Sequence, residues 1–282
     1  MKTPLIKTLL TTLLIIFIQS CAVSVKESNF ILHDETVTAF DTEQFITINK
    51  IKKNIRALPV TIKHADGINS QGLWIKQQNS DAVIIYFSGN NMRINDSYED
   101  ILPELLSFNT DIVWLDHRGL GASEGKATLE NLSQDGLDIF DYVKSKTDKK
   151  IILHGLSLGS FIAGNTAMNR PITALILEGS ATTAADWVDE LVPWYAKIFT
   201  RISIDEKFNI AGNENVVKSY HKPLFILVGE NDEVTPVSLN QKLYDLSVSS
   251  DKHIFIAEGS AHGNAIKNTA AKSAIKSFIS TL

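Results

Sequence analysis

Short apolar segments alternate with amphipathic helical segments along most of this chain. Apolar runs of strand length occur at 82–87, 112–115, 150–154, 172–177, 224–228 and 253–256. Segments with a helical pattern of apolar residues occur at 96–106, 131–146, 158–168, 241–246 and 265–278. Strands that are apolar on both faces, with helices between them, are typical of a mostly parallel sheet covered on both sides. We therefore predict an α/β fold.

The regular alternation indicates one large domain at 56–282. The domain opens with two strand-like segments, 58–63 and 73–76, separated by turn-rich residues, a pattern typical of a hairpin. Residues 181–213 interrupt the alternation, because this connection is longer than most loops in compact domains. We interpret 181–213 as a short helical cap over the edge of the sheet. The alternative is a peripheral helix whose aromatic residues pack among themselves.

The first twenty residues have the pattern of a secretory signal. Lys2 and Lys7 precede a run of about ten apolar residues, which is too short to span a bilayer as a helix. The run leads into Ile18-Gln-Ser-Cys21, which contains the single cysteine of the chain. This tetrapeptide resembles the lipobox of bacterial lipoproteins. The alternative is an ordinary signal peptide followed by an incidental cysteine.

The lipobox resemblance implies cleavage before Cys21 and acylation of its sulfur and of its new amino group. Residues 21–55 would then be a lipidated tether with an irregular approach to the domain. Several acyl chains together hold a soluble domain on a membrane, whereas one chain anchors it only marginally. Ala22 follows the cysteine, which by resemblance to the sorting rules of bacteria with two membranes favours the outer membrane. We expect a lipid-anchored protein of the bacterial cell envelope.

The charge and cysteine content argue against several other classes of function. The formal net charge is −5, from 27 Lys and Arg against 32 Asp and Glu, so no basic excess is present to bind a nucleic-acid backbone. A single cysteine excludes an intrachain disulfide. No histidine pair or thiolate cluster has the spacing of metal ligands, and no Gly-rich loop ends in Lys-Ser or Lys-Thr. We therefore predict neither a metal site nor a P-loop.

One short motif carries the strongest chemical signal. Gly155-Leu-Ser-Leu-Gly159 lies directly after a predicted strand and directly before a predicted helix. In this context the Gly-x-Ser-x-Gly pattern is typical of a nucleophile elbow, a turn so tight that small residues are needed on both sides of the serine. The turn exposes the hydroxyl of Ser157 at the carboxyl edge of the sheet. We predict that Ser157 is a nucleophile.

A serine nucleophile needs a base to accept its proton and a carboxylate to orient the base. Asp232 lies in a loop just past one predicted strand, and His262 lies just past the next. Both therefore occupy the edge where open α/β sheets bind their ligands. We predict Asp232 as the acid, with Glu230 and Glu233 as alternatives in the same loop. We predict His262 as the base; His117 is its rival but precedes the serine in the chain.

An oxyanion hole is also required to stabilise the tetrahedral intermediate. One donor is expected to be the backbone amide of Leu158, directly after the serine. The other is expected in the loop after the strand ending at Phe87, where we predict the amide of Asn90, with Asn91 as second choice. The alternative reading of this loop is an ordinary turn rich in Asn and Gly.

Residues 58–282 resemble the α/β-hydrolases, in particular small serine hydrolases of the esterase and peptidase-like branch. The segments that carry the resemblance are 86–90, 115–125, 154–159, 229–236 and 259–263. The family usually has His-Gly in the first of these, whereas this chain has Ser88-Gly89. The resemblance implies the α/β-hydrolase fold, a structural role for the loop 116–123, and no cofactor.

The predicted function is hydrolysis of a carboxylic ester, or of a thioester or amide, through an acyl-serine intermediate. The substrate would be a small molecule or an acyl ester. An apolar acyl pocket could be lined by aromatic residues of the cap, although core packing is their commoner use: Trp187, Trp194, Tyr195 and Phe199. Two alternatives stay open, namely a peptidase or deacylase acting on envelope material and a catalytically silent binding protein displayed on the membrane.

Overall fold

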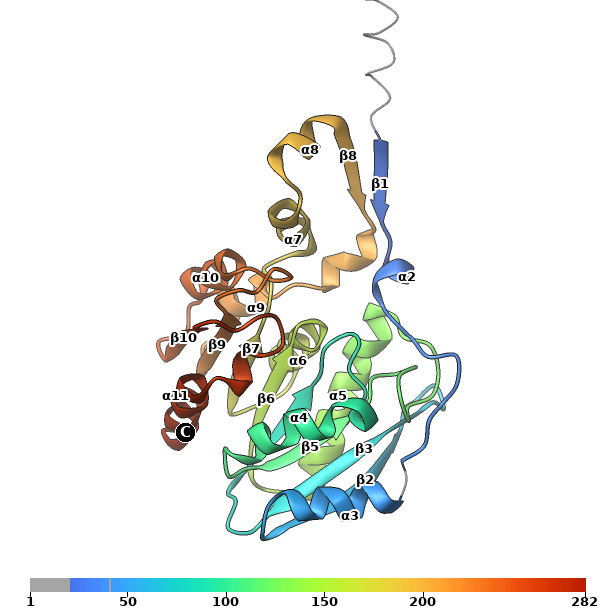
Figure 1. Cartoon of the computed structure of the whole chain (residues 1–282), viewed down its shortest axis with the longest axis vertical. Coiled ribbons are helices and arrows are strands. Elements are labelled where there is room, and N and C mark those ends of the chain that lie inside the picture. The colour runs from blue at the N-terminus through green and yellow to red at the C-terminus, as the bar shows by residue number, and fades with distance from the viewer. Residues whose placement is uncertain (1–20, 41) are drawn as a thin grey trace, which may run out of the picture.

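An eight-stranded β-sheet runs through the centre of the molecule (Figure 1). Its strands are β2 (Ile55–Lys63), β3 (Asn69–Gln77), β4 (Ala82–Phe87), β5 (Asp111–Leu115), β6 (Lys150–Leu156), β7 (Ala174–Glu178), β9 (Leu224–Gly229) and β10 (Lys252–Ala257). They follow the order β10-β9-β7-β6-β4-β5-β3-β2. Strand β3 is antiparallel to both of its neighbours, and all other pairs are parallel. The mostly parallel sheet predicted from the apolar runs is confirmed.

The structure is a computed structural model, and it describes residues 21–40 and 42–282. The predicted signal peptide, residues 1–20, lies outside the described residues. Within the described part of the chain, no helix is both long enough and apolar enough to cross a bilayer.

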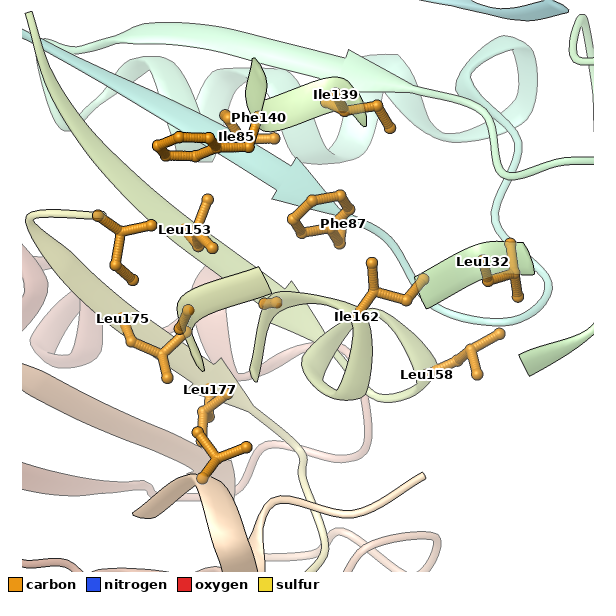
Figure 2. Close-up of a cluster of buried hydrophobic side chains, with 14 of the residues drawn as sticks. Ile85, Phe87, Leu132, Ile139, Phe140, Leu153, Leu158, Ile162, Leu175 and Leu177 are labelled. Carbon is orange, nitrogen blue, oxygen red and sulfur yellow. The ribbon is translucent and has the colours of Figure 1, made fainter. Parts of the chain in front are cut away.

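Helices cover both faces of the sheet (Figure 1). They are α3 (Thr42–Ile51), α4 (Ile94–Leu106), α5 (Leu129–Lys146), α6 (Leu158–Asn169), α9 (Glu214–Ser219), α10 (Val237–Leu246) and α11 (Thr269–Ser280). Helices α5, α6, α9 and α10 pack on one face, and α3, α4 and α11 on the other. Successive residues of β4 alternate between the two cores, so that Ile84 joins one and Ile85 the other. Figure 2 shows part of the first core, where Phe87 of β4 lies near Ile162 of α6.

The helix expected at 265–278 is divided in two. A short 3-10 helix, η2 (Ala265–Lys267), precedes α11. Between them the side chain of Asn268 accepts hydrogen bonds from the amides of Ala270 and Ala271, at 2.9 and 3.1 Å. An asparagine in this position satisfies the free amides at a helix start, so it ends one helix and begins the next.

The cap predicted at 181–213 is not wholly helical. It contains α7 (Ala184–Leu191), α8 (Trp194–Phe199), strand β8 (Thr200–Ile204) and the 3-10 helix η1 (Glu206–Ile210). Strand β8 pairs in parallel with β1 (Cys21–Val25), with Cys21 opposite Thr200 and Val25 opposite Ile204. This two-stranded ribbon projects from the body of the molecule at the end opposite α3 (Figure 1). The partner of β8 lies far away in the chain, so no local pattern indicates this strand. This explains why the sequence predicted a cap made of helices alone.

The segment predicted as an irregular tether, 21–55, is largely ordered against the domain. Besides β1 it holds a short helix, α2 (Glu27–Phe30), and the helix α3 on the sheet. Ile48 of α3 is fully buried in the second core. The segment therefore holds secondary structure and contacts the domain through a few buried side chains, which corrects its interpretation as an irregular tether.

Candidate active site

Ser157 lies in a sharp turn between β6 and α6, and its backbone is strained. Its φ is 54° and its ψ is −118°, a conformation that non-glycine residues rarely adopt. A Cβ on Gly155 would lie 2.3 Å from the carbonyl oxygen of Gly159, and one on Gly159 would lie 2.0 Å from that of Phe87. Because neither contact can be accommodated, both positions require glycine. The spacing of small residues around Ser157 thus follows from how closely the backbone segments approach.

Asp232 and His262 form a direct pair. His262 Nδ1 lies 2.8 Å from Asp232 Oδ2, and the Asp232 side chain is 1% exposed. The other carboxylate oxygen accepts hydrogen bonds from the amides of Val234 and Thr235, at 2.9 and 2.7 Å. Burial alone would raise the pKa of Asp232, but the hydrogen bonds from His262 and from Thr235 outweigh it and hold that pKa below its usual value. The carboxylate is thereby kept charged beside the imidazole.

The alternative acids and the rival base are placed elsewhere. Glu230 is exposed and accepts a hydrogen bond from the amide of Gly259, and Glu233 is exposed to solvent. His117 is buried, with its Nε2 2.7 Å from the carbonyl oxygen of Ser88. Since a carbonyl only accepts, His117 donates there, and its burial lowers its pKa. Of these candidates, the structure pairs only Asp232 and His262 with each other.

Ser157, Asp232 and His262 follow the carboxyl ends of β6, β9 and β10, at one edge of the sheet. The Ser157 amide donates to the carbonyl of Glu178, the last residue of β7, at 2.9 Å. A Cβ on the next residue, Gly179, would lie 3.1 Å from Cε1 of His262. Ser157 and His262 therefore flank the end of the same strand. As the structure describes them, the side chains of Ser157 and His262 form no hydrogen bond with each other. Hydrogen bonds between catalytic groups often tighten only when substrate binds.

The two predicted oxyanion donors lie on either side of the elbow. Leu158 is the first residue of α6, and Asn90 follows β4, whose last carbonyl lies against Gly159. Among the hydrogen bonds of the described residues, none uses the amide of Asn90 or of Leu158. Asn91, the second choice, is exposed, and its side-chain oxygen accepts from Arg93 at 3.0 Å. A role of these two amides in binding an oxyanion stays a prediction.

Ser88 replaces the histidine that α/β-hydrolases usually carry in this loop. Its side chain is fully buried, and its hydroxyl has no hydrogen-bond partner among the described residues. Its carbonyl is held by His117. The backbone at the start of the loop after β4 is therefore held by His117 and not by the side chain at position 88.

A small apolar cavity opens beside Ser157. Its volume is about 40 Å³. It is lined by Phe30, Ser157, Phe161, Ala181, Ala184, Trp187, Phe208, Ala211, Val234 and Thr235. None of these residues carries a charge. The cavity could hold the apolar part of a substrate next to the hydroxyl of Ser157.

The four aromatic residues expected in the pocket have different positions. Trp187 lines the cavity, and its indole nitrogen donates to the carbonyl of Val234 at 2.7 Å. Trp194 and Tyr195 are 73% and 59% exposed and pack edge to face on each other, which corrects the expectation for these two residues. Phe199 ends α8, and its side chain lies outside what the structure describes. Trp194 and Tyr195 therefore face solvent and do not line the cavity.

Comparison with known proteins identifies the family. The family model described as serine aminopeptidase, S33, matches residues 78–222, which is more than half of the chain. The chain belongs to this family. The matched residues include Ser157 and the loop after β4, whereas Asp232 and His262 follow the matched range.

Relatives among curated proteins include lysophosphatidylserine lipases and a bacterial protein, YfhR. The chain is 30% identical over 199 residues to the lysophosphatidylserine lipase ABHD12 of Macaca fascicularis, covering 64% of this chain and 50% of that protein. It is 26% identical over 226 residues to the protein YfhR of Salmonella typhi, covering 71% and 73%. The chain thus spans about half the length of the curated lipase it matches.

Solved structures show the same fold. A Pyrococcus furiosus esterase, Pf2001, superimposes with a TM-score of 0.66 at 19% identity, covering 89% of this chain and 99% of that one. The mouse alpha/beta hydrolase domain-containing protein 10 superimposes with a TM-score of 0.58 at 21% identity, covering 79% and 97%. These likenesses and the strand order confirm the α/β-hydrolase fold that the sequence predicted.

A second serine, histidine and aspartate group lies away from this site. His64 Nε2 is 2.8 Å from Ser70 Oγ, and His64 Nδ1 is 2.7 Å from Asp138 Oδ2. Ser70 and His64 are only 1% and 5% exposed. Asp135 completes a set of possible metal ligands with His64 and Asp138, but both of its oxygens accept from the Arg118 guanidinium. Burial and the contacts with Arg118 favour a structural role for this group. This agrees with the structural role predicted for the loop 116–123, which contains Arg118.

Sequence reasoning missed several residues that line the cavity. Phe161 and Phe208 carried no chemical signal, because apolar residues at helical spacing usually belong to the core. Phe30 was missed because its segment was interpreted as a tether. Only the long-range packing of that segment shows its place beside Ser157.

Proposed function

We propose that this protein is a serine hydrolase that cleaves carboxylic esters through an acyl-serine intermediate. The observation that carries the proposal is the position of Ser157. Its strained elbow exposes the hydroxyl to an apolar cavity, at the strand ends where Asp232 and His262 are paired. The family membership supports a hydrolase, and the lipases and esterases among the relatives support an ester substrate.

The proposed reaction proceeds in two halves. Ser157 Oγ attacks the carbonyl carbon of the ester and gives its proton to His262 Nε2, while the Asp232 carboxylate stabilises the imidazolium. The amides of Leu158 and Asn90 hold the negative oxygen of the tetrahedral intermediate. Collapse of this intermediate expels the alcohol, which takes the proton from His262. A water molecule then attacks the acyl-serine by the same route and restores the free hydroxyl.

The same reaction on a peptide amide is the second candidate, because the family is described as serine aminopeptidases. A site that recognises a free amino terminus needs a carboxylate or another acceptor for the ammonium group. No charged residue lines the cavity beside Ser157. The apolar lining therefore favours the acyl group of an ester or thioester over the amino end of a peptide.

The proposal also includes a lipid anchor at Cys21 and a place in the bacterial cell envelope, at the outer membrane. It is supported by the lipobox-like sequence and by the position of β1, which begins at Cys21. The ribbon of β1 and β8 projects from the body of the molecule (Figure 1). The neighbouring helix α8 exposes Trp194 and Tyr195, and such amphipathic rings favour the interface between membrane and water.

Hydrolysis of p-nitrophenyl butyrate by the Ser157→Ala variant tests the function. We expect the release of p-nitrophenol to fall to the background rate, because no acyl-serine can form, while the thermal unfolding transition stays close to that of the unmodified protein. Ser273→Ala is the matched control, since this exposed serine lies on α11 and bonds only to the carbonyl of Thr269. Unchanged hydrolysis by Ser157→Ala would falsify the role of Ser157. A panel that contrasts esters with aminoacyl p-nitroanilides separates the two candidates.

A further inference from the structure

Residues 21–38, here called the N-terminal strap, are fixed to the domain at both ends. At one end β1 pairs with β8 of the cap. At the other end the amides of Asp34 and Thr38 donate to the carbonyls of Gly119 and Gly121, both at 2.7 Å. The Asp34 carboxylate also pairs with the Arg93 guanidinium, whose Nε lies 2.8 Å from Oδ2. The course of the strap between these points is therefore set by the folded domain.

A buried charge holds the middle of the strap. The side chain of Glu27 in α2 is buried, and its Oε1 accepts from the amide of Leu129 at 2.6 Å. Leu129 is the first residue of α5, where a free amide favours a negative partner. Glu27 Oε2 accepts from Lys207 Nζ at 3.1 Å. One carboxylate thus links the strap to both the central domain and the cap.

The strap places an aromatic ring in the wall of the cavity beside Ser157. The ring of Phe30 packs edge to face on Trp187 and on Phe208, with centroids 5.5 and 5.6 Å apart. All three rings line the cavity. Trp187 and Phe208 belong to the cap, so Phe30 is the aromatic part of the wall that comes from the strap.

The strap also holds the side chain of Asn90, the proposed oxyanion donor. Asn90 Nδ2 donates to the carbonyl of Phe30 at 2.5 Å, and Asn90 Oδ1 accepts from the amide of Leu32 at 3.1 Å. The two bonds use both polar ends of the amide group, which fixes its orientation. A residue whose side chain is held in this way has little freedom to rotate its own backbone amide.

We propose that the N-terminal strap forms part of the active site and has two roles there. Phe30 limits the length of the acyl group, and the backbone of residues 30–32 positions Asn90. This inference rests on the proposed ester hydrolysis. An apolar cavity of roughly 150 Å³ holds a benzene ring. The present cavity, of about 40 Å³, is much smaller, so the ring of Phe30 in its wall restricts the space for an acyl group next to Ser157. The residue that selects the length of the acyl group, Phe30, thus belongs to the strap that begins at Cys21.

The first test compares esters of different acyl length. In the full chain, kcat/KM is measured for p-nitrophenyl acetate, butyrate and octanoate, and the octanoate to acetate ratio is taken for each variant. Phe30→Ala should raise this ratio about tenfold or more, because each extra methylene accommodated in an apolar pocket is worth roughly this factor. Phe40→Ala is the matched control: Phe40 packs on Phe45, with centroids 6.3 Å apart, against the other core. Its ratio should equal that of the unmodified protein.

An unchanged ratio in folded Phe30→Ala would overturn the role of Phe30. If that variant does not fold, Phe30→Leu makes a smaller change and should raise the ratio by a smaller factor; an unchanged ratio there overturns the role as well. Failure of the proposed function is a different result. If the unmodified protein hydrolyses none of the esters, the function is wrong, whereas hydrolysis with unaltered length preference contradicts the strap alone.

The second test concerns positioning. Asn90→Ala keeps the backbone amide but removes both side-chain bonds to the strap. We expect kcat to fall by about tenfold to a hundredfold, approaching the loss of one oxyanion donor, with a smaller change in KM. Rates are expressed per site titrated with a fluorophosphonate, so that a loss of folded protein does not alter them. A kcat equal to that of the unmodified protein would overturn the positioning role.

Discussion

Glu178 Oε2 lies 2.9 Å from His154 Nε2 in the interior of the molecule, directly beneath the nucleophile elbow. Both side chains are almost completely buried. The other carboxylate oxygen of Glu178 accepts from the amide of Ile266 at 3.1 Å, four residues after His262. The backbone carbonyl of Glu178 binds the amide of Ser157. A single residue thus connects the strand before the elbow, the elbow itself and the loop that carries His262.

Removal of this carboxylate should be strongly destabilising. Glu178→Ala leaves His154 Nε2 and the Ile266 amide buried without partners, and each buried polar group left without a hydrogen bond costs about 1–3 kcal/mol. Glu178→Gln keeps the shape and one acceptor oxygen, so its loss should be smaller. Urea unfolding of the two variants measures the difference. Equal stability of both variants and the unmodified protein would show that the pair does not support the elbow.

Asp232→Asn should abolish most activity while leaving the fold intact. The amide still fits the position, but it removes the negative charge that stabilises the imidazolium and fixes the tautomer of His262. In a serine, histidine and aspartate triad, this change lowers kcat by about 10⁴-fold. The control is Glu230→Gln, because Glu230 is exposed and faces Gly259. A loss of similar size in Glu230→Gln, with Asp232→Asn fully active, would reassign the acid.

The buried carboxyl of Asp116 should make stability depend on pH. Burial raises its pKa to about 6, against the opposing effect of hydrogen bonds from the amides of Ala122 and Ile94. Because the unfolded chain loses this proton near pH 4, ionisation between about pH 4 and pH 6 favours unfolding. The free energy of unfolding should therefore fall as pH rises through this window, by up to about 3 kcal/mol from this group.

Urea unfolding at several pH values, with Asp116→Asn for comparison, isolates the contribution of Asp116. Relative to the variant, the unmodified protein should be most stable near pH 4, and its relative stability should fall as the pH rises toward 6. A difference that stays constant over this range would mean that Asp116 is already ionised at pH 4.

Cys21→Ser tests the proposed anchor. Without a thiol, no acyl chain can be attached to the sulfur at position 21, so cells fed labelled palmitate should place label on the unmodified protein and none on the variant. Ser24→Ala is the matched control, because Ser24 is an exposed residue of the same strand, and it should take up label as the unmodified protein does. If the unmodified protein takes up no label, or Cys21→Ser takes up as much, the lipid anchor at Cys21 is absent.

The elements that depend on local patterns could be predicted from the sequence. The apolar runs located the strands of the sheet, and the small residues around Ser157 located the elbow, because close backbone contacts require glycine at Gly155 and Gly159. Asp232 and His262 could be named because loops after parallel strands converge on one edge. Each of these inferences needs only neighbouring residues and the order of elements.

The parts that depend on distant contacts could not be predicted. Pairing of β1 with β8 joins residues about 180 positions apart, and neither segment alone has a strong strand pattern. The bonds from Asn90 to Phe30 and Leu32 likewise join distant parts of the chain, so nothing in the local sequence of residues 21–55 indicates a place beside Ser157. The sequence places Trp194 and Tyr195 in the cap as possible lining of an acyl pocket, but only the packing of the cap shows that both side chains face solvent.

Trapping of the acyl-enzyme tests the central claim most directly. The protein is mixed with an excess of p-nitrophenyl butyrate, quenched in acid within the first turnover, digested and analysed by mass spectrometry. We predict a butyryl group on the peptide that contains Ser157, and no such adduct in Ser157→Ala. A butyryl group on another residue of an active enzyme, or rapid turnover without any covalent adduct, would contradict the account.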